Sequence, residues 1–241
     1  MTKRKTGFTL AEVLITLAII GIVAVLTVPS LIIKHQDKVA VAKLKRAYNI
    51  FYQAYQMATV EYGGIMLWNL ELGQEDMLID RFAKYMKFNK ICYIDELENC
   101  IYDGIYKSST DIDYCNFVAE RSEGITRAAG ILSDGSTVML NIRKSWINGW
   151  DEWPLQFYID LNGREKPNKL GDDFFYFFVS SDNKLTPGGG SSKNIADTQN
   201  AFAKNCLEAN GTSCANWVIE KGNRDYLRCK DLSYSGKSSC D

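Results

Sequence analysis

The chain begins with a long apolar run. From Phe8 to Ile33 the only charged side chain is Glu12. This run holds 26 residues, whereas about 20 helical residues are enough to cross a hydrocarbon core of roughly 30 Å. Residues 8–33 are therefore predicted to form a membrane-spanning helix.

An amphipathic pattern follows over residues 34–62. Its apolar residues recur at alternating spacings of three and four, as they do on one face of a helix. They are Val41, Leu44, Tyr48, Phe51, Tyr55, Ala58 and Tyr62. Gly63 and Gly64 favour the end of the helix. A coiled coil is the alternative, but the stripe is shorter than about four heptads, which favours packing on the chain's own globular domain.

Residues 63–187 have a mixed pattern that predicts an α+β globular domain. Gln74–Phe88 has one apolar helical face, and the segment Ser133-Asp134-Gly135-Ser136 is a hairpin signal. The predicted strands are Ala128–Leu132, Thr137–Ile142, Leu155–Leu161 and Phe174–Val179. The simplest fold is the long N-terminal helix packed on an antiparallel sheet of about four strands.

The C-terminal region differs in composition. Residues 188–194 are rich in Gly and Ser, which predicts a flexible linker. Ile195–Ala209 follows as a predicted short helix. The tail, residues 195–241, is too small to fold alone unless disulfides staple it.

The cysteines fall into two clusters without the Cys-x-x-Cys spacing of redox and zinc motifs. They are Cys92, Cys100 and Cys115, and then Cys206, Cys214, Cys229 and Cys240. Export of the region beyond the apolar run to an oxidising compartment would favour disulfides. The local candidates are Cys92–Cys100 and Cys206–Cys214, with Cys229 as a candidate to close the tail. Connectivity stays open, and the odd number leaves at least one thiol unpaired or intermolecular.

A basic head and a Gly-Phe junction precede the apolar run. Lys3, Arg4 and Lys5 predict that the N-terminus stays cytoplasmic while the rest is exported. A cleaved secretory signal fits less well, because its apolar region of about 7 to 15 residues ends in a small-residue cleavage site. The string Gly7-Phe8-Thr9-Leu10-Ala11-Glu12-Val13-Leu14-Ile15, followed by an apolar helix with Pro29 near its end, resembles the N-terminus of type IV pilins and type II secretion pseudopilins.

This resemblance covers roughly residues 3–33 and implies a pilin-like fold and a route of maturation. A prepilin peptidase would remove the leader, residues 1–7, by cutting between Gly7 and Phe8, and the new amine of Phe8 would be methylated. Glu12 would match the assembly glutamate of the family. The subunit would sit in the inner membrane and then join other pilin or pseudopilin subunits, through an inner-membrane assembly platform, in a periplasmic or surface filament.

The position of Glu12 gives a physical reason for that role. A charge at the bilayer centre costs about 2.5–3.5 kcal/mol, less near the interface, and such residues usually have a partner. Glu12 lies one helical turn after Phe8, on the same face, so it can meet the new amine within one subunit or between neighbours. The alternative is a glutamate tolerated close to the headgroups.

Pro29 predicts a kink, because it removes one helical hydrogen bond and clashes with the carbonyl of Val25. The kink is either harmless near the membrane surface or, as the resemblance implies, part of a segment that unwinds in the filament.

The loop after Asp160 is the candidate metal site. Asp160, Asn162, Asp172 and Asp173 offer the oxygen ligands that calcium prefers, and some pseudopilins bind calcium in a loop of their globular domain. The segment Asp160-Leu161-Asn162-Gly163 does not satisfy the EF-hand pattern, however. The alternative is a pair of ordinary turns with the acids facing water. The sequence predicts no cofactor, and calcium at this loop is the one candidate.

Composition and charge exclude several classes of protein. The formal net charge is −1, and it becomes −4 without the three basic residues of the leader. The chain therefore lacks the strong basic charge that would indicate nucleic-acid binding. Nucleic-acid binding is predicted only for a DNA-uptake role. The single histidine, His35, lies just past the membrane segment, and the chain has no phosphate-binding glycine motif. The sequence predicts no enzyme.

Two function classes remain. The first is a structural subunit, a pseudopilin or minor pilin, that polymerises through its N-terminal helix. The second is a binding module at a filament tip, where Trp146, Trp150 and Trp153 would contact DNA, carbohydrate or a surface. Tryptophans are more often packed in cores, which favours the first class. The sequence does not choose among secretion, adhesion, motility and DNA uptake.

Overall fold

The computed structural model describes residues 7, 9–68, 75–119, 125–143, 154–190 and 195–240. Contacts divide the chain into two compact units, Met1–Val39 and Ala40–Asp241. The division falls inside the long helix α1 (Leu10–Tyr62), which ends at the residue before Gly63, as the sequence predicts.

In the first unit, α1 is a single helix that runs through Gly21 and Pro29. Its large apolar side chains are exposed from Leu10 to Ile33. Among the described residues, one helix, α1, is long and apolar enough to cross a membrane, with a mean hydropathy of 2.6 in its most apolar part. Length and composition therefore agree with the predicted span, and the kink at Pro29 stays a prediction.

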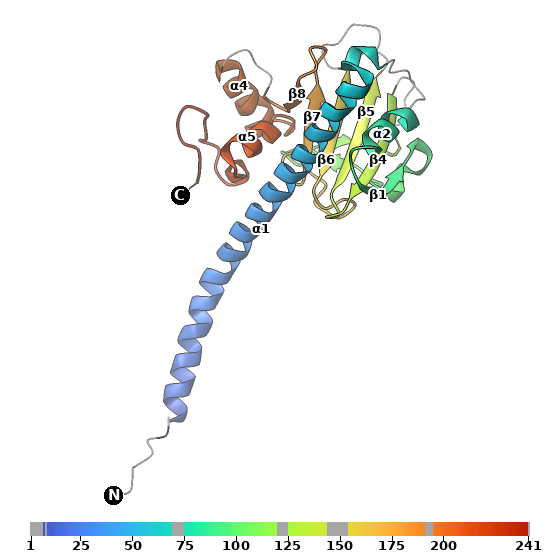
Figure 1. Ribbon diagram of the computed structural model, residues 1–241. Helices are drawn as coiled ribbons and strands as arrows, with labels where there is room; N and C mark the ends of the chain where they lie inside the picture. Colours follow the sequence, from blue (N-terminus) through green and yellow to red (C-terminus); the bar gives the residue numbers. More distant parts are fainter. Residues whose placement is uncertain are drawn as a thin grey trace, which may run out of the picture. The chain divides into compact units, whose positions relative to one another are not determined.

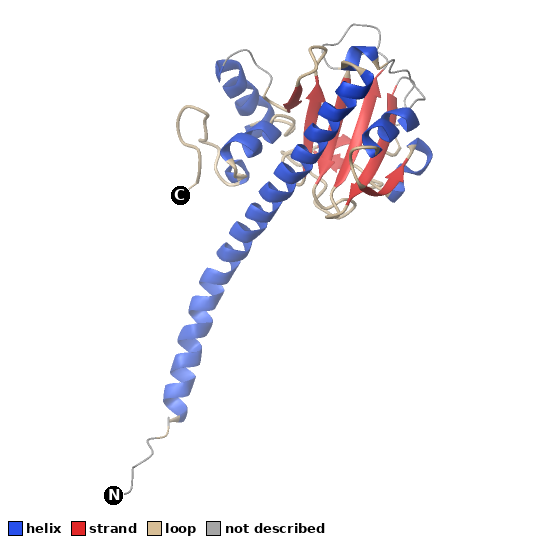
Figure 2. Ribbon diagram, viewed as in Figure 1, coloured by secondary structure: helices blue, strands red, loops and turns tan. Residues whose placement is uncertain are grey.

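The second unit is built on an antiparallel sheet, which has six strands among the described residues. The order across the sheet is β1-β4-β5-β6-β7-β8, shown in red in Figure 2. The strands are β1 (Phe88–Cys92), β4 (Ile125–Leu132), β5 (Thr137–Arg143), β6 (Leu155–Asp160), β7 (Phe174–Val179) and β8 (Leu185–Pro187). The four predicted strands form the centre of the sheet with nearly the predicted bounds. The edge strands β1 and β8 were not predicted.

Short elements complete this unit on both sides of the sheet. They are η1 (Ile65–Leu67), α2 (Glu75–Ala83), η2 (Ile94–Asn99), β2 (Tyr106–Lys107) and β3 (Asp113–Cys115). The predicted helix Gln74–Phe88 is too long at its C-terminal end. The chain turns after Ala83, and Phe88 then pairs with Leu132 as the first residue of β1. Pairing with β4 thus overrides the helical pattern there.

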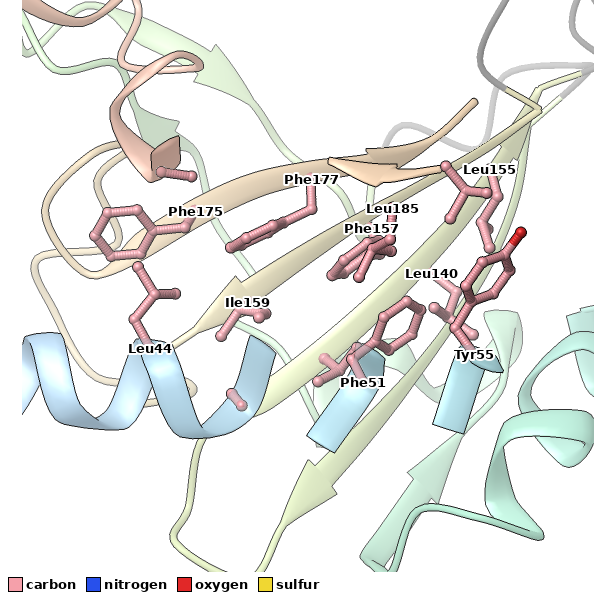
Figure 3. Packing of buried hydrophobic residues seen from close by; sticks show 14 of the residues in the cluster. Leu44, Phe51, Tyr55, Leu140, Leu155, Phe157, Ile159, Phe175, Phe177 and Leu185 are labelled. Carbon is pink, nitrogen blue, oxygen red and sulfur yellow. The ribbon is translucent and has the colours of Figure 1, made fainter. Parts of the chain in front are cut away.

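The second half of α1 lies across one face of the sheet (Figure 1). Phe51 stacks on Phe157 of β6 with ring centroids 3.9 Å apart. Both side chains are fully buried. The α1 residues buried in this core, several of them shown in Figure 3, are Val41, Leu44, Ala47, Phe51, Ala54, Tyr55 and Ala58. They agree with the predicted apolar face, at whose margin Tyr48 and Tyr62 are half-buried.

Alternation along the strands gives the sheet two apolar faces. In β5, Val138 and Leu140 belong to the core under α1, whereas Met139 belongs to a second cluster on the opposite face. Tyr106 and Phe117 are buried in that second cluster. Because both faces are covered, the central strands are apolar on both sides.

The C-terminal tail packs against β7 and β8 (Figure 1). Its elements are α4 (Ile195–Phe202), the π-helical turn η3 (Ala203–Leu207), α5 (Cys214–Lys221) and η4 (Asp225–Leu227). The rings of Phe202 and Trp217 stack with centroids 4.2 Å apart, and both belong to the core under α1. The predicted helix Ile195–Ala209 corresponds to α4 and η3.

The predicted flexible linker, residues 188–194, begins as a packed contact. Gly188 is buried, its amide donates to the carbonyl oxygen of Tyr176, and its carbonyl oxygen accepts a hydrogen bond from the amide of Asn216. A Cβ on Gly188 would lie 2.0 Å from the carbonyl oxygen of Thr212. Glycine is therefore needed at this position so that the tail can approach β7 closely. The composition of the segment predicted an exposed connection because it does not reveal this contact. Residues 191–194 lie outside the described residues.

Candidate functional site

Helix α1 begins with three hydrogen bonds between Thr9 and Glu12. Thr9 precedes the first helical residue, and its hydroxyl accepts a hydrogen bond of 3.2 Å from the amide of Glu12. In return, Oε2 of Glu12 accepts hydrogen bonds of 2.9 Å from the amide and from the hydroxyl of Thr9. This arrangement is a capping box, which satisfies amides that the helix itself leaves without partners. Glu12 thus has a structural role within a single chain.

Glu12 is also an isolated charge on a helical surface suited to an apolar environment. Its neighbours Leu10 and Leu14 are 80% and 59% exposed. Further along the helix, the hydroxyls of Thr16, Thr27 and Ser30 donate to carbonyl oxygens of the preceding turn at 2.9 Å each. Polar groups satisfied within the helix are what lipid, or a packed neighbouring helix, requires.

Comparison with known proteins identifies this segment. Residues 2–28 match the family model described as Prokaryotic N-terminal methylation motif. The chain carries a prepilin-type signal. No curated protein and no solved structure matched the chain.

The prepilin-type signal confirms the resemblance to type IV pilins and pseudopilins, and the observed α+β fold with its long N-terminal helix agrees with a pilin-like fold. The motif supports an assembly subunit of the pilin or pseudopilin type. Its signal implies processing by a prepilin peptidase and assembly with other pilin subunits, and together with the apolar helix it indicates a membrane-anchored stage before the filament.

The structure places only some residues of the prepilin-type signal. Gly7 is exposed at the start of the described chain, and Phe8 lies outside the described residues. Pairing of Glu12 with the amine of Phe8 therefore stays a prediction. Pro29 and His35 are exposed positions of α1. Thr9 was missed as a partner of Glu12, although a Thr three residues before a Glu at the start of an apolar run is the usual signal of a capping box.

Two of the candidate calcium ligands are buried together. Asp160 and Asp173 are 1% and 5% exposed. Asp173 accepts hydrogen bonds from the backbone amides of Asn168 at 2.8 Å and Lys169 at 2.7 Å, and Asp160 accepts one from the Tyr106 hydroxyl at 3.2 Å. Burial, followed by the nearby charge of Asp173, raises the pKa of Asp160 well above its usual value. Burial also raises the pKa of Asp173.

The other two candidates have different surroundings. Asp172 forms an ion pair with Arg224 of the tail, with Oδ1 and Nη1 2.7 Å apart. The side-chain amide of Asn162 donates to the carbonyl oxygen of Lys166 at 3.0 Å. Within the described ranges, no three or more acidic, histidine or cysteine side chains are arranged to hold a metal ion. The structure thus brings Asp160 and Asp173 together but turns Asp172 toward the tail, and calcium binding stays a prediction.

The described cysteines form three disulfides. They are Cys92–Cys100, Cys206–Cys214 and Cys229–Cys240. The first two are the local pairs that the spacing suggests, and the third closes the tail. Cys115 of β3 is half-buried and lies outside these three bridges. The three tryptophans of the predicted tip surface, Trp146, Trp150 and Trp153, lie outside the described residues.

Proposed function

We propose that this chain is a structural subunit, a pseudopilin or minor pilin, of a type II secretion or type IV pilus filament. A prepilin peptidase cuts between Gly7 and Phe8, and the helix that follows anchors the subunit in the inner membrane before it joins the filament. The observation that carries this proposal is the match of residues 2–28 to the methylation motif. The exposed apolar half of α1 supports it, since such a surface requires lipid or other helices.

Two further features support export of the second unit. The basic residues Lys3, Arg4 and Lys5 precede the apolar helix, which favours a cytoplasmic N-terminus. The three disulfides all lie in the second unit, and disulfides persist in oxidising compartments such as the bacterial periplasm.

In the proposed filament, Glu12 pairs with the amine of Phe8 on a neighbouring subunit. This role competes with the capping box seen in the single chain, and the two can be separated by chemistry. A capping box accepts either Glu or Gln at the third helical position, whereas pairing with an amine requires the charged carboxylate.

The decisive experiment uses Glu12→Gln and, as a matched control, Thr9→Ala in the full chain. Glu12→Gln keeps the cap and removes the charge, so we expect normal membrane insertion with a loss of filament incorporation of more than about tenfold, because it leaves a buried cation without its partner. Thr9→Ala removes the cap at a cost of about 1 kcal/mol of helix stability and keeps the charge, so incorporation should persist. The measurement is an immunoblot of sheared filaments against membranes.

The opposite pattern, with normal incorporation of Glu12→Gln and loss in Thr9→Ala, would assign Glu12 to capping alone. Processing is tested separately by mass spectrometry of the mature N-terminus. An intact Met1, or a cut far from Gly7, would refute the filament proposal. The tip-binding alternative rests on tryptophans outside the described residues, so no observation in the structure favours it.

A further inference from the structure

The loop between η3 and α5 of the tail carries a short motif with known chemistry. Asn210-Gly211-Thr212 fits the pattern Asn-x-Ser/Thr, in which x is any residue except proline and the asparagine can accept an N-linked glycan in an exported protein. No other asparagine of the sequence meets this pattern. The pattern is short and arises by chance, so its meaning depends on the geometry of these three residues, called the sequon below.

Local contacts hold the loop that carries the sequon. The disulfide Cys206–Cys214 closes this loop, and the backbone amide of Gly211 donates to the carbonyl oxygen of Asn205 at 2.7 Å. Gly211 has a φ of +85°, and a Cβ there would lie 2.4 Å from the carbonyl oxygen of Leu170. Only glycine fits such a position without strain, so the centre of the sequon has a defined conformation.

The side chain of Asn210 is held by the threonine of the sequon. Its Oδ1 accepts a hydrogen bond of 3.1 Å from the backbone amide of Thr212 and one of 2.7 Å from the hydroxyl of the same residue. A backbone amide can only donate, so the oxygen of the side-chain amide must be the atom that faces Thr212. Nδ2 makes no hydrogen bond with any residue that the structure describes. The nitrogen is therefore left available for a reaction.

The two hydrogen bonds at Oδ1 favour a reaction at Nδ2. An amide nitrogen is a poor nucleophile, because its electron pair is shared with the carbonyl group. When Nδ2 gives up a proton, negative charge develops on Oδ1, and the two donors of Thr212 stabilise that charge as the donors of an oxyanion hole do. The contact that holds the side chain thus also lowers the cost of forming the reactive species.

The surroundings of the sequon allow an enzyme to reach it. Asn210 is half-buried, and Glu208, two residues before it, is exposed. Glu208 forms no ion pair within the part of the chain that the structure describes, so its carboxylate can bind a cationic group of an enzyme. The backbone is anchored from the other hairpin, since the amide of Ser109 donates to the carbonyl oxygen of Asn210 at 3.2 Å.

We propose that Asn210 accepts an N-linked glycan from a lipid diphosphate-linked oligosaccharide, in a reaction of an oligosaccharyltransferase on the exported side of the membrane. Nδ2 attacks the anomeric carbon of the first sugar, and an N–C bond forms as the C–O bond to the diphosphate breaks. The electron pair of the broken bond leaves with the lipid diphosphate, and Nδ2 loses one proton to a base of the transferase. The proposal goes beyond the filament role and rests on the export that this role implies.

Mass spectrometry of the full chain, purified from membranes and sheared filaments of the cells that produce it, tests the proposal. We expect the peptide that contains Asn210 to carry the added mass of an oligosaccharide and to release sugar fragments in the spectrum. Asn210→Gln should lose this mass completely. The matched control is Asn205→Gln, which changes an exposed asparagine of the same loop outside the sequon and should keep it.

Two changes at Thr212 separate a glycan acceptor from an ordinary turn. Thr212→Val keeps the shape of the side chain but removes one of the two donors to Oδ1, so the modified fraction should fall at least about tenfold. Thr212→Ser keeps the hydroxyl and should stay within about threefold of the wild type. Resistance to trypsin checks that each variant is folded.

An unmodified Asn210 in the wild type would overturn the proposal. Equal modification of Thr212→Val and Thr212→Ser would overturn it too, because the hydroxyl would then have no part in the reaction. The same spectra report the N-terminus of the chain. Failure of the filament proposal would therefore appear separately as an intact Met1, whatever is found at Asn210.

Discussion

At the scale of single residues, Asp160 gives the fold a pH dependence of known sign. Burial, and then the charge of Asp173, raises its pKa in the folded chain. Its stabilising contribution is therefore complete below the unfolded pKa of about 3.9 and is lost as the pH rises through the higher folded pKa. Asp160→Asn cannot titrate. We expect this variant to gain unfolding free energy relative to the wild type as the pH rises from about 4 to about 8, as measured by urea unfolding of the full chain in detergent.

Asp182 supplies a control of opposite sign. It is exposed, and a hydrogen bond from Ser180 lowers its pKa. Its contribution is present above the unfolded pKa of about 3.9 and is lost as the pH falls through the lower folded pKa. Asp182→Asn should therefore lose stability relative to the wild type as the pH rises through about 4. Parallel behaviour of the two variants would contradict burial as the origin of the Asp160 effect.

Calcium binding is tested at the same two buried carboxylates. A bound ion stabilises the folded state by mass action, so calcium should raise the melting temperature of the full chain and a chelator should reverse the shift. Asp173→Asn should abolish the shift. Asp172→Asn should keep it, because Asp172 is engaged with Arg224. Identical melting curves with calcium and with chelator would refute calcium binding.

At the scale of elements, the packing of α1 on the sheet depends on Phe51. Its ring is fully buried, and it stacks on Phe157 and on Phe82. Phe51→Ala should lower the unfolding free energy by about 3–5 kcal/mol, the usual range for a buried Phe. The neighbouring Tyr52 is 42% exposed, so Tyr52→Ala should cost about 0.5 kcal/mol or less. The measurement is urea unfolding of both variants. An equal loss of unfolding free energy in the two would contradict the structure, in which one face of α1 is buried on the sheet and the other is exposed.

The sequence predicts the central elements because their signals are local. A turn at Asp134-Gly135 joins two alternating segments, and the φ of +82° at Gly135 is one that favours glycine. Edge strand β8 has three residues and ends in Pro187, so it carries no readable pattern and depends on β7 for its pairing. Edge strand β1 was not predicted because its first residue, Phe88, continues the apolar face of the preceding predicted helix.

The candidate site shows the same difference between residues with a local sequence signal and residues whose surroundings depend on distant parts of the chain. The signal that includes Gly7 and Glu12 could be recognised because it is contiguous in sequence, and the roles of these two residues stay predictions. The surroundings of Asp160 were not predicted, because Tyr106 reaches it from 54 residues away in the chain. Asp172, adjacent to Asp173 in sequence, was grouped with it, but the fold directs it to Arg224 instead. Contacts of this kind depend on the tertiary structure and leave no local signal.

At the scale of the whole molecule, the prepilin-type signal and the docked tail lie in different parts of the chain. The prepilin-type signal lies within the first unit, residues 1–39, and the tail packs entirely within the second. The tail is held by its close approach at Gly188, by the ion pair of Arg224 with Asp172, and internally by the Cys229–Cys240 disulfide. A change at one of these contacts should therefore alter the tail without abolishing incorporation into filaments.

Gly188→Ala tests this separation, because its Cβ would lie 2.0 Å from the carbonyl oxygen of Thr212 and must push the tail away from β7. We expect limited proteolysis to release a C-terminal fragment at least about tenfold faster than in the wild type, since cleavage follows the population of the open form. Sheared filaments should still contain the variant.

The matched comparison is the double variant Cys229→Ser with Cys240→Ser, which should lose up to about 3 kcal/mol of stability but keep the tail docked through Gly188. If the tail of Gly188→Ala resisted proteolysis as well as that of the wild type, the glycine contact would not be what holds the tail. If the variant were lost from filaments, the two units would not act independently.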